Sequence, residues 1–413
     1  MRENSNRAKP FDCIVLGGGL VGLTAAIALS KINLRVALVE KNPLKKEGSR
    51  TTDHRTSAIA ASGKIMLDTL GLWESIASFA EPILDIRVSE KGLENFVHYN
   101  NRDSENQPMG YIIENDVFKH SLITATQASS HLSLFHGHSV KGYTANENST
   151  KLLLDNGDTI KGTLLVAADG ANSRARELAG IPARKYNYKQ TSIVFTVAHT
   201  LPHYGVAHER FLAGGPIAFL PMTNKRSSVV WTEKTEIAQA LMALGEEEFL
   251  RGASLRIDDC LGQLKIQGKR VTFPLSLITT ETLISDRLAL IGDAARRIHP
   301  IAGQGLNLGL RDIAHLTDKL AEARYLGIDI GESTVLKGFQ AARRLDIMSL
   351  IFATDGLNRL FSNNLRTVKA IRGLGLSSIN RMIPIKKVLM KAAMGQLGDL
   401  PSLLKGSISP YSN

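Results

Sequence analysis

The chain has 413 residues, 43% of them hydrophobic and 22% charged, which is enough for two domains or for one elaborated domain with an extension. Its two cysteines, Cys13 and Cys260, argue against a disulfide framework and indicate a reducing compartment. No apolar run approaches the ~18 residues of a membrane span, and Met1–Pro10 is polar, so we expect a cytoplasmic protein without a secretory signal.

The first strong pattern spans Phe11–Glu40. A short apolar run predicts a buried parallel strand, and the small apolar residues from Leu20 to Leu29 predict a helix packed on its sheet. Val36–Val39 predicts the next strand, which ends at Glu40. The turn between the first strand and the helix fits G-x-G-x-x-G through three glycines, namely Gly17, Gly19 and Gly22.

Each glycine has a mechanical role in a dinucleotide site. Gly17 allows the tight turn, Gly19 lets a pyrophosphate approach the backbone, and Gly22 packs the helix onto the strand. The helix N-terminus directs free N–H groups and the positive end of its dipole at a phosphate. Glu40 lies 23 residues beyond Gly17, where its carboxylate can accept hydrogen bonds from ribose hydroxyls. The pattern therefore predicts a dinucleotide site.

Arg55 follows the polar loop after this unit. It precedes a helical pattern over Ile59–Leu70 and so stands near a predicted helix start. There it could contact a pyrophosphate or a flavin, or it could be a surface charge of the capping region. The spacing leaves both interpretations open.

The next elements are shorter. Ile86–Ser89 predicts a strand that leaves the nucleotide-binding unit, and Tyr111–Leu122 predicts a strand followed by a helix with its N-cap at Asn115-Asp116. Ser133–Leu154 alternates enough to predict short antiparallel strands.

A second strong pattern is an apolar strand that ends at Asp169-Gly170 and leads into a helix carrying Arg176. An acid at the carboxyl end of a strand lies at the edge where open α/β sheets bind ligands, which predicts a position close to the cofactor. An Asx turn that caps the helix would also explain Asp169, but not the whole pattern.

From about residue 183 to residue 283 the character changes. The pattern predicts three strands, at Thr191–Val197, Ile217–Leu220 and Ser228–Thr232. It predicts a helix over Glu236–Arg251. We expect an inserted antiparallel or mixed sheet that forms one wall of a substrate cavity.

The third strong pattern starts with an apolar strand over Leu288–Ile291 that delivers Asp293, whose carboxylate can bind a polyol hydroxyl. After a turn containing Pro300, a glycine-rich segment opens a helix over Asn307–Leu320. That helix N-terminus can stabilise negative charge on a reduced flavin ring.

These three patterns together resemble the class A flavin monooxygenases, the family typified by para-hydroxybenzoate hydroxylase. Gly17–Gly22 with Glu40 matches their ADP-binding fingerprint. Asp169–Arg176 looks like the Asp-Gly motif that members use near FAD and the nicotinamide donor, and Gly292-Asp293 resembles the motif whose acid holds the ribityl chain. Further motifs are similar to the ubiquinone-biosynthesis hydroxylases: Asp53–Ala58, Gly215–Pro221, His299–Gly309, Phe339–Asp346 and Ala353–Phe361.

The resemblance implies an α/β fold with a Rossmann-like FAD-binding domain of parallel sheet and ββα layers, an inserted mixed β-sheet substrate domain, and a C-terminal helical extension. The FAD-binding domain then comprises residues 1–82, 106–182 and 283–335, the substrate domain 83–105 and 183–282, and the basic extension 336–413. The residues expected to bind the cofactor are Gly17, Gly19, Gly22, Glu40, Arg55, Asp169, Asp293, Pro300, Gly303, Gln304, Gly305 and Asn307.

The activity implied is hydroxylation of the ring of a polyprenylated phenol in ubiquinone biosynthesis, with FAD as cofactor, NAD(P)H as electron donor and O₂ as co-substrate through a flavin C4a-hydroperoxide. Because the reactive group belongs to the cofactor, no catalytic side chain is assigned, and no metal site is expected. Four side chains are candidates for a base only by residue type, and a packing or surface role suits each of them. They are His54, His203, Tyr204 and His299.

The charge of the chain is unevenly distributed. From Gly356 to the end there are nine basic residues and one acidic residue, a net charge of +8 within a total of +11. The segment Leu374–Met394 mixes Leu, Ile and Met with Arg and Lys, so it either lies at the anionic inner face of the membrane or forms a solvated helical face. Without aromatic interleaving or a recognised module, nucleic acid is not an expected partner, whereas a ubiquinone-biosynthesis complex is a possible one.

Three rivals follow from the same patterns. A flavin halogenase would carry a Trp-x-Trp-x-Ile-Pro signature, but the two tryptophans, Trp73 and Trp231, are far apart. A flavin reductase or oxidase acting on an isoprenoid stays open. A non-catalytic FAD-fold carrier of prenylated lipid, or an assembly partner, stays open as well.

Overall fold

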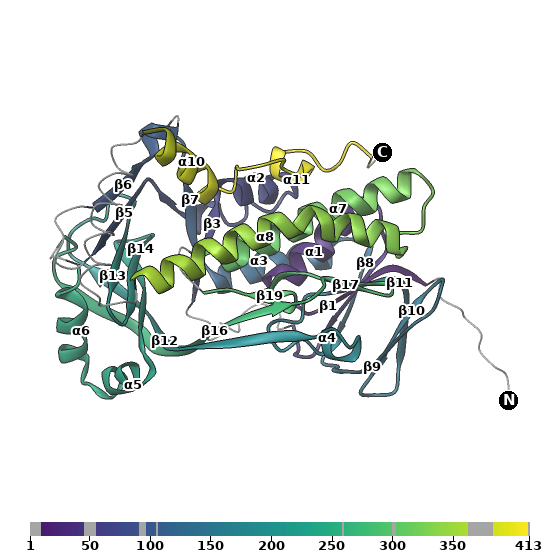
Figure 1. Cartoon of the computed structure of the whole chain (residues 1–413), viewed down its shortest axis with the longest axis horizontal. Helices are drawn as coiled ribbons and strands as arrows, with labels where there is room; N and C mark the ends of the chain where they lie inside the picture. Colours follow the sequence, from purple (N-terminus) through teal and green to yellow (C-terminus); the bar gives the residue numbers. More distant parts are fainter. Residues whose placement is uncertain are drawn as a thin grey trace.

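The computed structural model describes residues 10–44, 55–90, 96–104, 106–257, 260–299, 303–361 and 383–411. These residues form an α/β protein with two large sheets and one small sheet, joined by long helices that run across the molecule (Figure 1).

The first sheet is the nucleotide-binding sheet that the sequence predicts. Its path is β17-β18-β11-β1-β2-β8, with β10 and β9 attached to β11. β1, β2, β8, β11 and β18 are parallel where they pair. The last four residues of β1 and of β11 and all of β18 are buried. The strands are β1 (Phe11–Leu16), β2 (Val36–Glu40), β8 (Leu132–His136), β9 (Val140–Ala145), β10 (Thr150–Leu154), β11 (Thr159–Ala167), β17 (Ile284–Ser285) and β18 (Leu288–Leu290).

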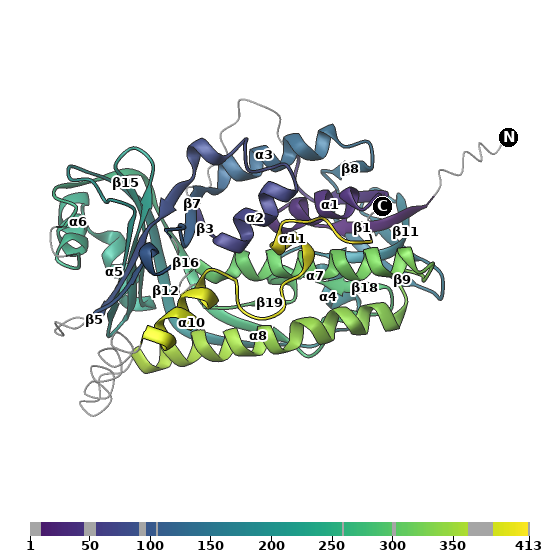
Figure 2. The same cartoon turned by 90° about the horizontal axis from the view of Figure 1, so that it is seen from above.

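The helices of this sheet share one large core with it. α1 (Leu20–Lys31) packs against α3 (Asn115–Ala128) and α7 (Gln304–Tyr325), while the short α4 (Arg174–Leu178) follows β11. α8 (Ser333–Phe361) lies alongside α7 and extends toward the second sheet (Figure 2). A fully buried helix such as α1 needs small apolar residues, which is what Leu20–Leu29 provides.

The second sheet is mixed and follows the order β19-β16-β12-β15-β14-β13-β5-β6. Its strands are β5 (Asp85–Glu90), β6 (Phe96–Asn100), β12 (Ala183–His199), β13 (Val206–Leu212), β14 (Gly215–Met222), β15 (Arg226–Lys234), β16 (Leu264–Thr280) and β19 (Arg296–Arg297). The long strands β12 and β16 extend from this sheet toward the first one (Figure 1). The expected inserted sheet is therefore present, including the strand predicted at Ile86–Ser89.

The two faces of the second sheet have different neighbours. The face that carries Ile193, Phe219 and Trp231, called here the outer face, is covered by α5 (Thr235–Ala243) and α6 (Glu246–Ser254). The face that carries Ala207 and Leu220, called here the inner face, packs toward the small sheet, the helix Ala61–Thr69 and the C-terminal segment. Its partners there are Ala61, Ile83, Met109, Ile112, Met390 and Met394.

The remaining elements lie between the two large sheets or close the C-terminal part. The small sheet contains β3 (Thr56–Ala60), β7 (Gly110–Glu114) and β4 (Glu81–Ile83), and α2 (Ala61–Thr69) follows β3. Short 3₁₀ turns occur at Ala77–Phe79, Asn101–Ser104 and Gly292–Ala294. α10 (Ile383–Ala393) and α11 (Ser402–Lys405) complete the described chain, and none of its helices is both long and apolar enough to cross a bilayer.

Several local predictions were wrong. The helix expected from Ile59 begins only at Ala61, because Thr56–Ala60 pairs with Gly110–Glu114 as a strand and tertiary pairing overrides the helical pattern. Arg55 therefore precedes a strand. The N-cap of α3 is Glu114, and the side chain of Asn115 instead accepts a hydrogen bond from Ser57.

Two further predictions also need correction. Glu236–Arg251 is two helices, because Gly245 is extended between them. In Ser133–Leu154 only β9 and β10 form an antiparallel pair. The first strand, β8, pairs in parallel with β2, since a crossover through α3 returns the chain in the same direction.

Candidate functional site

The three sequence patterns meet at one edge of the first sheet. Leu16 at the end of β1 is in register with Ala167 of β11 on one side and with Val39 of β2 on the other. Ala167 is in turn in register with Leu290 of β18. Parallel neighbours end at the same edge, so the residues that follow these strands gather there. This edge carries Gly17, Glu40, Asp169 and Asp293.

The glycine turn has the geometry that each predicted role requires. Gly17 has φ +110°, and a Cβ there would lie 2.4 Å from the carbonyl oxygen of Ala168. A Cβ on Gly22 would lie 1.8 Å from the carbonyl oxygen of Gly17, so the first turn of α1 sits directly on the glycine turn. A Cβ on Gly19 would meet no described protein atom within 4 Å. The open side of the turn is therefore at the glycine that a pyrophosphate must approach.

Glu40 is tied to the same turn. Its Oε2 accepts a hydrogen bond from the Gly18 N–H at 2.5 Å, and its Oε1 accepts one from the Asn42 N–H at 2.9 Å. The carboxylate is thereby oriented at the end of β2. It keeps lone pairs for a further donor, since a carboxylate accepts about four hydrogen bonds.

Asp169 acts as a helix cap in this structure. Its carboxylate accepts hydrogen bonds from the N–H groups of Arg174 at 2.7 Å and Ala175 at 3.1 Å, and from the Ser173 hydroxyl at 2.5 Å. Asp169 thus satisfies the first N–H groups of α4 from five and six residues upstream, whereas an Asx turn spans two residues, and the N-cap residue itself is Ser173. The carboxylate is occupied by α4, although its backbone lies against Gly17. A direct contact of Asp169 with a cofactor stays a prediction.

The turn that carries Asp293 is fixed from two sides. The Gly292 N–H donates to Asp312 at 2.9 Å, and the Ala294 carbonyl accepts from the Arg176 guanidinium at 2.8 Å. Arg176 comes from the second sequence pattern and Asp312 from α7. The second and third patterns are therefore linked by a side-chain hydrogen bond as well as by strand order.

Asp293 itself remains open to solvent on one side. Burial by the surrounding protein raises the pKa of its carboxyl group above the ordinary value, and Arg297, Arg296 and Arg55 act in the opposite direction. Arg55 thus lies within electrostatic reach of Asp293. Its guanidinium also lies over the ring of Phe273, 5.2 Å from the centroid.

The N-terminus of α7 contributes the glycine-rich segment. Gly303 is left-handed with φ +61° and forms the N-cap, Gln304 and Gly305 are in the first turn, and Pro300 lies outside the described residues. The Asn307 amide accepts from the Ala60 N–H and donates to the Ala58 carbonyl, both at 2.9 Å. In this structure Asn307 fastens α7 to β3.

The residues present fit a dinucleotide with a ring system at its far end. In the described chain, neither α1 nor α7 has a side-chain cap or an acidic residue in its first turn. Neither a capping side chain nor an acidic residue therefore competes with an anionic ligand at these two helix N-termini. The position of a Cβ on Gly305, like that on Gly19, is more than 4 Å from every described protein atom.

Comparisons with known proteins agree with this geometry. A family model described as an FAD binding domain matches residues 11–342. The ubiquinone hydroxylase UbiL of Rhodospirillum rubrum is 39% identical over 96% of this chain and 93% of its own length. The chain belongs to the FAD-dependent ubiquinone-biosynthesis hydroxylase family. The mitochondrial ubiquinone biosynthesis monooxygenase COQ6 of Homo sapiens is 32% identical over 93% of this chain and 92% of its own.

Solved structures show the same fold. The p-nitrophenol 4-monooxygenase of Pseudomonas putida superposes with a TM-score of 0.76, at 17% identity, over 93% of this chain and 98% of its own. PqsL of Pseudomonas aeruginosa gives a TM-score of 0.75 at 20% identity over 90% and 100%. The family identification thus rests on the sequence relatives, and these structures add the architecture.

The histidines and the tyrosine considered as bases have other roles where the structure describes them. His203 accepts a hydrogen bond from the Gly205 N–H at Nδ1, and its Nε2 lies 2.8 Å from the Met222 carbonyl oxygen. Tyr204 is 76% exposed. His299 is buried and packs edge-on against Tyr188. His54 lies outside the described residues.

The sequence patterns do not predict two features of this chain. One is a buried charge network of Asp312 in α7, Arg296 in β19 and Arg343 in α8, which has no local signal because its members come from three different elements. The other is Glu209, a carboxylate in the second sheet. No local signal separates it from a solvated strand residue, because the face on which a residue lies depends on pairing with distant strands.

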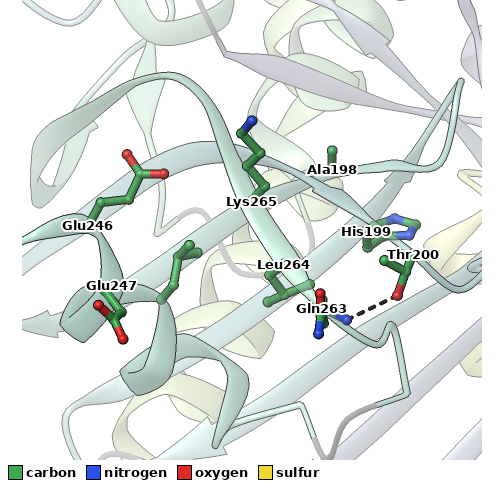
Figure 3. A pocket seen from close by; sticks show the side chains of 9 residues that line it. Ala198, His199, Thr200, Glu246, Glu247, Gln263, Leu264 and Lys265 are labelled. Atoms are coloured by element: carbon green, nitrogen blue, oxygen red, sulfur yellow. Dashed lines mark hydrogen bonds between the residues drawn. The ribbon is translucent and has the colours of Figure 1, made fainter.

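A separate pocket of about 650 Å³ lies at the opposite end of β12 and β16 from Ala183 and Thr280 (Figure 3). His199 and Thr200 line one side of it, and Glu246 and Glu247 of α6 line the other. Both His199 ring nitrogens are engaged, with the Leu201 carbonyl and the Ser227 hydroxyl. The pocket contains none of the predicted cofactor residues.

Replacing Asp293 tests the assignment of this site. We expect Asp293→Ala to weaken FAD binding about 10- to 100-fold, because a hydrogen bond to a charged group contributes about 1.5–3 kcal/mol. Quenching of FAD fluorescence on titration with apoprotein measures the dissociation constant. The exposed carboxylate of Asp68 supplies the control, Asp68→Asn. Unchanged FAD affinity in folded Asp293→Ala protein would remove Asp293 from the site.

Proposed function

We propose that this FAD enzyme hydroxylates the aromatic ring of a polyprenylated phenol in ubiquinone biosynthesis, with electrons from NAD(P)H and oxygen from O₂. The observation that carries the proposal is similarity to ubiquinone hydroxylase UbiL over 96% of the chain, together with a complete set of strand ends at the nucleotide edge. The chemistry that FAD supplies in such enzymes is acceptance of hydride and activation of O₂ for transfer of one oxygen atom.

The side chains and backbone groups at the edge would hold the cofactor. We assign the pyrophosphate to Gly19 and the N-terminus of α1, the ribose hydroxyls to Glu40, and the polyol chain to Asp293. Gly303, Gln304 and Gly305 open α7, whose N–H groups and dipole favour negative charge beside the ring system. Arg55 adds a positive charge near Asp293.

The inner face of the second sheet supplies the apolar wall that a prenyl chain requires. Met109, Met222, Met390 and Met394 are buried together there with Ile83, Ile112 and Ala207. Methionine side chains are flexible and adapt to irregular apolar partners. Such a wall also excludes water from the ring being oxidised.

Isotope transfer tests the proposed reaction. The purified holoenzyme is supplied with NADH or NADPH, 2-prenylphenol and ¹⁸O₂, and the products are examined by mass spectrometry. We expect phenol-dependent NAD(P)H oxidation coupled to O₂ uptake and one labelled oxygen in the ring. Turnover of the phenol without O₂ would contradict the proposal and favour an isoprenoid reductase. The quinone precursor that accumulates when the protein is absent then identifies the ring carbon and the chain length.

We further propose that α10 brings the enzyme to an anionic membrane surface, where a lipid-tailed phenol resides. Met390 and Met394 bury one side of this segment against the inner-face cluster. Its other side exposes Val388 (52%) and Leu389 (39%) beside Lys387 and Lys391. Apolar and basic groups exposed together suit the boundary between lipid headgroups and acyl chains. The part of the predicted segment over residues 374–382 lies outside the described residues.

Charge removal on α10 tests the membrane contact. We expect Lys386→Gln/Lys387→Gln/Lys391→Gln to bind phosphatidylglycerol-containing vesicles about 100-fold more weakly, because each basic residue contributes about 1 kcal/mol at such a surface. FAD content should not change. The control replaces three exposed lysines of the first sheet, Lys141, Lys151 and Lys161, by Gln. Equal, salt-insensitive vesicle binding by both variants would contradict the electrostatic contact.

A further inference from the structure

Glu209 lies on the inner face of the second sheet, which three neighbouring strands establish independently. In β13, Ala207 belongs to the inner-face cluster and Leu212 packs with the outer core. Side chains alternate along a strand, so Glu209 points to the inner side with Ala207. Its register partners agree: Ala218 of β14 shares a face with Leu220, and Val88 of β5 shares a face with Ile86.

Glu209 belongs to a row of side chains that crosses the inner face from strand to strand. The register places Glu209 beside apolar residues throughout this row, which we call the Glu209 row. Its members are Val88, Glu209, Ala218, Val230, Val194 and Val271. All six keep part of their surface accessible. On the outer face, the neighbouring Ile193, Phe219 and Trp231 are at most 2% exposed.

The flanking rows connect the Glu209 row to the cofactor site. On one side, the Ser228 hydroxyl accepts a hydrogen bond from Thr56 at 2.8 Å. On the other side, the Phe273 ring lies under the Arg55 guanidinium, which reaches Asp293 electrostatically. The row therefore passes between the two positions at which residues 55 and 56 touch the sheet. Glu209 lies two strands from β15, or about 10 Å at ordinary strand spacing.

A carboxylate in an apolar row has an altered acidity. Burial raises the pKa of Glu209 to about 7, so the group exchanges a proton near neutral pH. His208 and Arg210, its neighbours in sequence, point to the other face, where Arg210 contacts Ser89. The inner face itself carries Tyr99 and Arg226, and Arg226 pairs with Glu114 at 2.7 Å. The elements packed against this face add further charged or titratable groups: Arg55, Lys64, Asp68, Glu81 with His203, Tyr111, Lys386, Lys387 and Lys391.

We propose that Glu209 is the base that ionises the phenol during hydroxylation, an inference that rests on the proposed function. The phenol O–H bond breaks, its proton moves to a carboxylate oxygen of Glu209, and both bonding electrons stay on the phenolate oxygen. The phenolate is the more electron-rich ring and is therefore the better acceptor of an electrophilic oxygen atom. The proton returns to the product oxygen before release, so the carboxylate is regenerated. The apolar members of the Glu209 row hold the ring beside it and keep water away.

Ultraviolet spectra of the bound phenol test this step without turnover. The holoenzyme is titrated with a fluorinated 2-prenylphenol whose solution pKa is about 7, because a carboxylate with a pKa of about 7 does not hold the proton of an ordinary phenol, whose pKa is ~10. The difference spectrum reports phenolate. At pH 7 we expect the wild type to bind much of this phenol as phenolate, and Glu209→Gln, whose amide accepts no proton, to bind it neutral. Wild-type protein that binds the phenol without ionising it, or Glu209→Gln that ionises it equally, would overturn the proposal.

Steady-state kinetics distinguish a base at Glu209 from a purely structural residue. We expect Glu209→Gln to lower kcat/KM for 2-prenylphenol about 100-fold and to abolish the loss of activity below pH 7. A fluorinated 2-prenylphenol that is already ionised in solution should restore most of the rate. Glu233→Gln, the same change on the outer face of the same sheet, is the control. If Glu209→Gln lost as much kcat/KM with the ionised phenol as with 2-prenylphenol, Glu209 would not be the base. Phenol ionisation without hydroxylated product from wild type would contradict the proposed function alone.

Discussion

Gly22→Ala is expected to destabilise the fold and abolish retention of FAD, whereas Gly19→Ala loses mainly FAD affinity. At Gly22 a methyl group would lie 1.8 Å from the Gly17 carbonyl oxygen, which is backbone and cannot rotate away. Relief requires α1 to move off the turn, so we expect a loss of about 2–3 kcal/mol in the free energy of unfolding. Urea denaturation of the apoproteins measures it.

The Gly19→Ala variant separates packing from cofactor contact. Its methyl group meets no described protein atom within 4 Å, and φ −80° is allowed for alanine. The free energy of unfolding should fall by no more than about 1 kcal/mol, because alanine is a poorer N-cap than glycine. FAD affinity should fall at least about 10-fold, because the methyl group occupies the side from which the pyrophosphate approaches. Wild-type FAD affinity in Gly19→Ala would place the pyrophosphate elsewhere.

The second large effect is expected at the buried charge network. Asp312 is fully buried and accepts from Arg296 at 2.6 Å and from Arg343 at 2.7 Å. Asp312→Asn leaves the buried Arg296 guanidinium without this counter-charge and removes one of the two carboxylates that Arg343 contacts, the other being Asp346. We expect a loss of about 3–5 kcal/mol in the free energy of unfolding. The exposed pair Lys64–Asp68 is the control, since Asp68→Asn should cost under about 0.5 kcal/mol. Comparable losses of unfolding free energy in Asp312→Asn and Asp68→Asn would contradict a stabilising role of the buried charge network.

The difference in stability between wild type and Asp312→Asn should depend on pH in a defined direction. Burial alone would raise the pKa of Asp312, but the Arg296 and Arg343 guanidinium groups outweigh it and hold that pKa below the ordinary value. The wild type therefore keeps this stabilisation above pH ~4 and loses it as the pH falls through the lower folded-state pKa. The stability gap between wild type and Asp312→Asn should be constant from pH 7 to about 5 and narrow below about pH 4.

The nucleotide-binding unit could be predicted from sequence because its signals are local. A buried strand, a glycine turn, a helix of small apolar residues and an acid after the next strand all occur within Phe11–Glu40. The strands that deliver Asp169 and Asp293 end in equally short motifs. Their neighbourhood on one sheet edge follows from the rule that ligands bind at the carboxyl ends of parallel strands.

The errors and omissions come from long-range pairing. Ile59 and Ala60 fit the helical pattern of Ile59–Leu70, but they pair with Tyr111 and Gly110 as the end of β3. The sequence pattern predicts β8 as an antiparallel strand, but a crossover pairs it in parallel with β2. Glu209 resembles a solvated residue until β5 and β14 fix its face. Asp312 and Arg343 lie on different helices, and only the packing of α7 against α8 shows that they neutralise each other.

An experimental structure of the FAD-loaded enzyme tests the central claim most directly. We expect the pyrophosphate within hydrogen-bonding distance of the backbone N–H groups after Gly19, a ribose hydroxyl on Glu40, and the polyol chain on Asp293. Flavin density that is well ordered but reaches only one of these three strand ends would contradict a shared site at this edge.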